Sequence, residues 1–81
     1  MKLQLLFFSV LQDITGTAEL AWISTPGTQV TDLLNSLYER WPKLRDWDSS
    51  LLVAINQTYV KREACLIDNA EVAIMPPVQG G

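Results

Sequence analysis

The sequence predicts an α+β domain in which one main helix packs on one face of a mixed β-sheet. Three observations carry this prediction. Two strand-like runs come first, one amphipathic helical stripe follows them, and further strand-like runs complete the chain. Because a helix between strands acts as a crossover, the strands on both sides of it are expected to join one sheet. With 81 residues, the chain has room for one domain.

The N-terminal part of the chain is expected to form two strands. In the first strand, over residues 2–10, alternate positions form an apolar face: Leu3, Leu5 and Phe7. The other face mixes polar and apolar side chains: Lys2, Gln4, Leu6 and Phe8. A polar turn region around residues 13–16, with room for one short helical turn, leads to a second strand over residues 17–23.

The clearest element is an amphipathic helix over residues 30–41. Its apolar residues recur with the spacing of one helical face: Val30, Leu33, Leu34, Leu37, Tyr38 and Trp41. A Ser-Thr-Pro-Gly turn at residues 24–27 precedes it, and Thr28 is the expected N-cap. Pro42 is expected to end the helix. Residues 43–50, which include Trp47, are expected to form a loop with a helical turn.

The second half of the chain is expected to supply the remaining strands. The apolar run over residues 51–56 predicts a buried central strand, and residues 58–60 and 64–67 predict short strand pieces. A turn at Asp68-Asn69 leads to the last strand, over residues 71–75. The order β-β-α-β-(β)-β favours a β-grasp. We therefore expect a β-grasp domain over residues 1–75 and an extended tail over residues 76–81.

Composition and charge exclude several classes of function. The net charge is −3 and the six basic residues form no long run, so a nucleic-acid partner is not expected. No apolar run reaches the roughly 18–20 residues that a membrane span requires, so no membrane association is expected. Cytoplasm is the expected location, because the one cysteine, Cys65, excludes an intramolecular disulfide.

The reactive side chains do not predict a catalyst. The chain has no histidine, which leaves no Cys/His metal site, and Cys65 is expected to be a small buried or half-buried apolar residue. Asp46 and Asp48 are expected to solvate a polar loop rather than to act as an acid and a base. No Ser–His–Asp set, phosphate-binding loop or dinucleotide fingerprint is present.

The C-terminal run EVAIMPPVQGG is the first candidate functional site. Pro76 and Pro77 cannot donate to a sheet ladder and hold φ near about −65°, so they direct the chain off the sheet. From Pro76 to Gly81 the chain reaches at most roughly 20 Å. Gly80 and Gly81 lack Cβ atoms, so this end can enter a narrow cleft, and its carboxylate suits activation as an acyl adenylate. The alternative is an inert terminal segment.

The second candidate is a partner-binding patch at the root of this tail. If the Leu3 face of the first strand packs on the helix, Phe8 and Met75 lie on the opposite side of the sheet. Tyr59 is expected to join them, with Val60 turned inward. The patch would continue into the tail through Pro76, Pro77 and Val78. The alternative is a scatter of exposed apolar residues, which is common on protein surfaces.

Three segments of the sequence resemble one known family. LLFFSVLQDITG, LLVAINQTYV and EVAIMPPVQGG are similar to the opening strand and turn, the central strand and turn, and the closing strand and tail of the MoaD/ThiS sulfur carriers. This family has a ubiquitin-like β-grasp fold and includes molybdopterin synthase small subunits. The resemblance spans the whole chain and implies apolar partner contacts at Phe8, Tyr59 and Met75.

The resemblance also implies a chemical role. Gly81, next to its required neighbour Gly80, would be adenylated by a ubiquitin-activating-like adenylyltransferase that uses ATP, with no cofactor bound permanently to the carrier. The resulting thiocarboxylate would donate sulfur to cyclic pyranopterin monophosphate on the large synthase subunit, within a heterotetramer. The alternatives are a carrier for thiamine thiazole or another thiolated product, and a ubiquitin-like modifier joined to lysines of other proteins.

Overall fold

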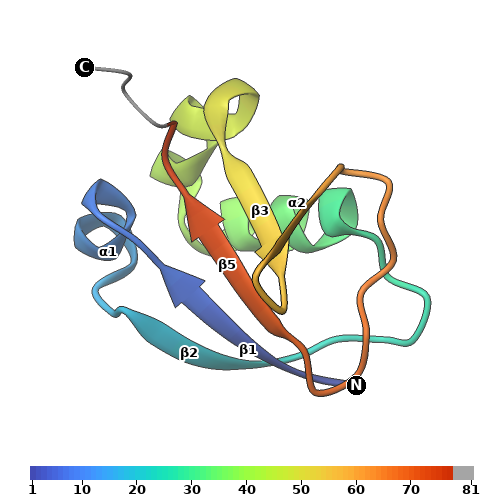
Figure 1. The fold of residues 1–81 in the computed structure, drawn as a ribbon. Coiled ribbons are helices and arrows are strands. Elements are labelled where there is room, and N and C mark those ends of the chain that lie inside the picture. Colours follow the sequence, from blue (N-terminus) through green and yellow to red (C-terminus); the bar gives the residue numbers. More distant parts are fainter. Residues whose placement is uncertain (78–81) are drawn as a thin grey trace.

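The structure is a computed structural model and describes residues 1–77 (Figure 1). Its elements follow in chain order: β1 (Lys2–Phe7), α1 (Val10–Thr15), β2 (Glu19–Ile23), α2 (Val30–Arg40), the 3-10 helix η1 (Pro42–Ser50), β3 (Leu52–Ile55), β4 (Thr58–Val60) and β5 (Glu71–Met75). None of the helices in this described part of the chain is long and apolar enough to cross a membrane.

The strands form one mixed sheet with the order β2-β1-β5-β3-β4. β1 runs parallel to β5, whereas the β1–β2, β3–β5 and β3–β4 pairs are antiparallel. α2 crosses one face of this sheet, as Figure 1 shows. This arrangement confirms the predicted α+β domain with a β-grasp topology. β3, in the segment predicted as a buried central strand, is a buried interior strand paired with β5 and β4, and β5 lies at the middle of the sheet, where its parallel pairing with β1 joins the two halves.

The core lies between α2 and the inner face of the sheet. On the sheet, alternate residues are buried, as their period of two predicts: Leu3, Leu5, Phe7, Val53, Ile55, Val72 and Ile74. On α2, the buried residues follow the predicted stripe: Val30, Leu33, Leu34, Leu37 and Tyr38. Full burial of each large aliphatic side chain contributes about 1.5–3 kcal/mol. Trp22, Trp41 and Trp47 are partly buried and pack against this core.

Two element boundaries differ from the prediction at α2. Gln29, not Thr28, is the N-cap, and it forms a capping box in which the Gln29 N–H donates to Asp32 Oδ2 at 3.1 Å. The Thr28 hydroxyl instead donates to the Thr25 carbonyl at 2.7 Å, which closes the preceding turn. α2 ends at Arg40, with Trp41 as its C-cap.

Three other segments also differ. Residues 42–50 form a 3-10 helix rather than a loop with one helical turn. Residues 64–67 form an isolated bridge, Gln29–Cys65, instead of a strand. Their backbone pairs with the start of α2, because the Val30 N–H donates to the Ala64 carbonyl at 2.9 Å. The second strand starts at Glu19 rather than at residue 17.

The first strand ends at Phe7 rather than at residue 10, because a tight turn follows it. The Leu11 N–H donates to the Phe8 carbonyl at 3.1 Å, and Ser9 has φ 56° and ψ −133°. These angles are close to those of the second residue of a type II′ turn, where glycine is favoured. The turn redirects the chain into α1 and leaves Phe8 at the end of the sheet.

We expect Ser9→Gly to raise the free energy of unfolding by about 0.5–1 kcal/mol. Glycine removes the cost of positive φ that serine carries in the folded state, and this gain exceeds the extra conformational entropy that glycine gives the unfolded chain. Urea denaturation measures this change. Ser36→Gly, in the exposed middle of α2, is the matched control, and it should destabilise the fold by about 0.5 kcal/mol. A Ser9→Gly variant no more stable than the wild type would contradict the turn strain.

Candidate functional site

The face of the sheet opposite α2 carries a continuous apolar surface two rows deep. The strand register places one row across four strands: Leu6, Ala73, Ala54 and Tyr59. The second row lies nearer the end of β5: Phe8, Met75 and Leu52. We call the residues of these two rows the outer apolar patch. Phe8 is 43% exposed and Tyr59 is 65% exposed, so the patch meets solvent through its large side chains, whereas Ala54 beneath them is only 6% exposed.

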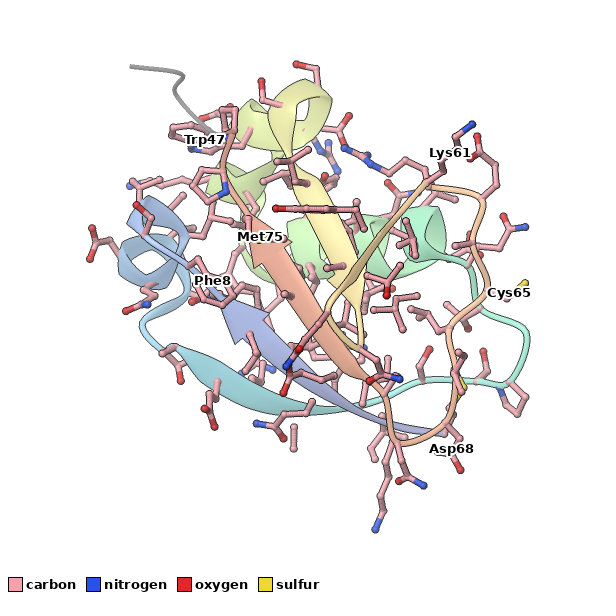
Figure 2. All side chains as sticks on the ribbon, viewed as in Figure 1. Phe8, Trp47, Lys61, Cys65, Asp68 and Met75 are labelled. Atoms are coloured by element: carbon pink, nitrogen blue, oxygen red, sulfur yellow. The ribbon has the colours of Figure 1, made fainter. Side chains whose placement is uncertain are left out.

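The centre of the outer apolar patch is hollowed. A hollow of about 290 Å³ is lined by patch residues and by two polar neighbours: Leu6, Phe8, Ala54, Gln57, Tyr59, Glu71, Ala73 and Met75. Phe8, Tyr59 and Met75, the contact residues named from the sequence, all line it, and Figure 2 shows Phe8 and Met75 near one another at the end of β5. The structure therefore brings the three residues together. Their role in partner binding stays a prediction.

The tail leaves the sheet from this same surface. Met75 ends β5, and Pro76 and Pro77 follow it directly, both half-buried. Val78, Gly80 and Gly81 lie outside the described residues, so their predicted roles rest on the sequence. The described geometry places Pro76 directly after Met75, which lines the hollow.

Sequence reasoning missed four members of the outer apolar patch. Leu6 and Ala73 share strand parity with Phe8 and Met75, so the signal for them was present in the alternation. Leu52 and Ala54 required knowledge that β3 lies beside β5. The β3–β4 hairpin, whose turn residues Asn56 and Gln57 both have positive φ, then brings Tyr59 next to Ala54.

A second cluster joins α2, η1 and the segment after β4. The Tyr38 hydroxyl donates to Asp48 Oδ1 at 2.5 Å, and Arg62 pairs with the same oxygen at 3.1 Å. Arg62 also donates to the Asp48 carbonyl. Burial, followed by the hydrogen bond to Asp48, raises the pKa of Tyr38 above its ordinary value. The hydrogen bonds from Tyr38 and Arg62 hold the pKa of Asp48 below its ordinary value.

These contacts correct two expectations about reactive side chains. Asp48 does not simply solvate a loop, since it ties three segments together and is therefore structural. Cys65 is exposed rather than buried or half-buried. Its neighbours Ala64 and Leu66 pack against the core or lie within it, and the alternation of the extended segment turns Cys65 outward. In Figure 2 it lies far from Phe8 and Met75.

We expect Asp48 to make stability depend on pH in the acid range. A carboxyl with a lowered folded-state pKa contributes stability above its unfolded pKa, here near 3.8, and that contribution is lost as the pH falls through the folded value. Urea denaturation between roughly pH 5 and pH 2.5 should show that the free energy of unfolding falls more steeply with decreasing pH in the wild type than in Asp48→Asn. Asp46→Asn, in the same helix, is the control. Equal pH slopes in all three proteins would contradict this role of Asp48.

Known proteins match this chain over nearly its whole length. The ThiS family profile matches residues 5–81. The chain is 33% identical to the molybdopterin synthase sulfur carrier subunit of Escherichia coli K12, over 98% of this chain and 99% of that protein. It is 31% identical to the subunit of the same description from Chlamydomonas reinhardtii, over 100% of both chains.

Solved structures have the same fold. A putative molybdopterin converting factor subunit 1 from Pyrococcus furiosus superposes with a TM-score of 0.86 at 26% identity, covering 96% of this chain and 99% of that one. Small archaeal modifier protein 1 from Methanosarcina acetivorans superposes at 0.79 with 28% identity, covering 99% and 96%. A complex of subunits 1 and 2 of the molybdopterin-converting factor from Helicobacter pylori contains a chain that matches at 0.69 and 20% identity, covering 100% of both, which shows the fold alone.

Proposed function

Since the chain belongs to the ThiS family, we propose that it is the sulfur carrier subunit of a molybdopterin synthase. The observation that carries the proposal is the full-length similarity to such subunits, at 33% identity over 98% of this chain for the Escherichia coli protein. The geometry supports it, because the outer apolar patch and the root of the tail share one surface. The folded domain then serves to dock the chain and to present its end.

The proposed chemistry takes place at the carboxylate of Gly81. A carboxylate oxygen attacks the α-phosphate of ATP on a ubiquitin-activating-like adenylyltransferase, and pyrophosphate leaves. The terminal sulfur of a donor persulfide then attacks the carbonyl carbon and AMP leaves. A second thiol reduces the resulting acyl disulfide, which yields the thiocarboxylate and leaves that thiol and the donor joined as a disulfide. Gly80 and Gly81 suit this step because a backbone without Cβ atoms lets a catalytic cleft close around it. ATP is a substrate of the activating enzyme and not a resident cofactor of the carrier.

The charged carrier then delivers its sulfur in a complex. The outer apolar patch docks on the large synthase subunit, with Phe8, Tyr59 and Met75 as the main contacts. Pro76, Pro77 and Val78 lead the tail into the active site of that subunit, where cyclic pyranopterin monophosphate accepts the sulfur. Two carriers and two large subunits form a heterotetramer. The similarity to molybdopterin synthase sulfur carrier subunits supports a partner of this kind, because such a subunit belongs to a larger synthase.

Protein modification is the second candidate function. The similarity to small archaeal modifier protein 1 favours it, at 28% identity and a TM-score of 0.79. Both functions start from an activated Gly81, but a modifier ends as an isopeptide on a lysine of another protein. Tryptic Gly-Gly remnants do not arise from this tail, so conjugates are detected as mass-shifted bands with an antibody to the chain. A carrier for thiamine thiazole or another thiolated product remains the third alternative.

Intact mass spectrometry tests the proposed function. The full chain is incubated with its adenylyltransferase, ATP and a sulfur donor. We expect a gain of about 16 Da, the mass difference between sulfur and oxygen, and its loss again when the large subunit and cyclic pyranopterin monophosphate are added. Omission of ATP is the control. Loading without any transfer to the pterin would favour one of the alternatives, and no ATP-dependent mass change would refute the sulfur-carrier role.

A further inference from the structure

We infer that the partner element that docks on the outer apolar patch carries one protruding apolar side chain, which enters the hollow over Ala54 and Ala73, and an adjacent basic residue, which pairs with Glu71. This inference rests on the proposed function, because it assumes that the patch binds a protein, and it adds the chemistry of the partner surface. Neither Ala54, Ala73 nor Glu71 was a candidate from the sequence.

The shape of the hollow specifies a protruding side chain. Ala54 and Ala73 lie directly opposite each other on β3 and β5. Side chains at such positions are about 4.5–5.5 Å apart, so two methyl groups form a continuous floor. Phe8, Tyr59 and Met75 are much larger and line the same hollow. A flat partner surface would rest on these three and leave the floor unfilled, whereas a single apolar side chain fills it, as interface anchors commonly do.

The charge next to the hollow specifies a cation. Glu71 lines the hollow, two residues before Ala73 on the same face of β5. Within residues 1–77 the ion pair of the structure is Arg62–Asp48, and no basic side chain forms one with Glu71. Gln4, the register partner of Glu71, is a neutral amide.

A second carboxylate, that of Glu19, adds negative charge near the hollow beside Glu71. Glu19 lies opposite Leu6, at the β2 end of the first row of the outer apolar patch, and the Gln4 amide donates to Glu19 Oε2 at 3.3 Å. Toward the tail the surface is apolar, whereas Glu71 and Glu19 flank the hollow on its other sides, with Lys2 farther along β1 on the same face. A partner with an apolar side chain followed by Lys or Arg matches both parts, and like charge would be rejected there.

Binding of full-length variants to the large molybdopterin synthase subunit of the same organism tests the inference. Isothermal titration calorimetry at low and high salt measures the dissociation constant. Ala73→Leu fills the hollow and should weaken binding by at least about tenfold. Glu71→Gln should weaken it about fivefold at low salt and make the dissociation constant less dependent on salt.

Two variants serve as matched controls. Ala21→Leu makes the same change on the outer face of β2, at a residue that does not line the hollow. Glu39→Gln removes an exposed carboxylate from α2, which covers the other face of the sheet. Both should bind as the wild type does. Thermal unfolding of every variant confirms that the fold is retained, and Glu71→Gln keeps the test decisive if Ala73→Leu fails to fold.

The outcomes separate the inference from the proposed function. If the wild type does not bind the large subunit, the proposed function fails and the inference fails with it. If the wild type binds and Ala73→Leu and Glu71→Gln match their controls, only the inference is overturned. Sedimentation of the wild type alone adds one check, because a dimer that Ala73→Leu disrupts would identify a second copy as the occupant and overturn the inference.

Discussion

Deleting Gly81, or appending one residue after it, is expected to lower sulfur transfer by about 100-fold or more while leaving the fold intact. Catalysis between positioned groups loses about this much when the reacting atom is displaced by about 1 Å, and one residue displaces it by more than 3 Å. Deletion also leaves Gly80 as the terminus, so the carboxylate would stop short of the position at which the partner's active site acts. Appending a residue converts the Gly81 carboxylate into an amide, which cannot be adenylated there.

The fold should not respond to either change, because the buried core lies within residues 3–74. Thiocarboxylate formation is measured by intact mass, transfer by molybdopterin production, and stability by thermal unfolding. Gln79→Asn keeps the length of the tail and serves as the control, with activity near that of the wild type. If sulfur transfer survived both changes at Gly81, another group would carry the sulfur and the assignment would be wrong.

Phe8→Asp is expected to weaken binding to the large subunit by about 100-fold with little loss of stability. Phe8 is 43% exposed and belongs to the outer apolar patch, so Asp would place a charge at the centre of a desolvated contact. Its neighbour Phe7 is 1% exposed and lies in the core. The Phe7 ring packs edge-to-face on the Trp41 ring, with 5.9 Å between the ring centroids. The two adjacent residues therefore separate a docking role from a folding role.

Phe7→Ala and Phe8→Ala form the matched pair for this prediction. Phe7→Ala should lower the free energy of unfolding by about 3–5 kcal/mol, whereas Phe8→Ala should change it by less than about 1 kcal/mol. Urea denaturation measures both, and calorimetry measures the binding of Phe8→Asp. Unfolding of Phe8→Asp would place Phe8 in the core, and unchanged binding would remove the patch from the interface.

Several features of this fold were readable from local patterns. The helical stripe predicted the buried face of α2, and strand alternation predicted that Phe8, Met75 and Tyr59 would lie on the outer face. The Asp68-Asn69 turn was also predicted, and Asn69 adopts the left-handed conformation there, with φ 64°. These predictions succeeded because a period of two or of 3.6 residues decides which side of an element faces the core. The tail residues Gly80, Gly81 and Val78 remain predictions.

Other features depended on choices between competing local hydrogen bonds. Thr28 is the residue type that favours an N-cap, but its hydroxyl closes the preceding turn, so the capping box falls to Gln29. Asp48 carries no sequence signal of its own, because its partners Tyr38 and Arg62 come from segments ten and fourteen residues away. Cys65 faces solvent because it alternates with Ala64 and Leu66, which pack on the core, along a segment that bridges to Gln29 and not to the main sheet.

By itself, the sequence determined the fold class and the face on which the residues of the alternating strands lie, and the role of its Gly80-Gly81 end stays a prediction. Only the tertiary structure decided which strands are neighbours. The parallel pair β1–β5 joins segments from opposite ends of the chain and sets Ala73 beside Leu6, while the β3–β5 pair sets Ala54 beside Ala73. The hollow and its acidic side exist because of these pairings. Alternation is a local property of one strand, whereas strand order is fixed by long-range packing, so a sequence pattern can indicate an apolar face but not the shape of its surface.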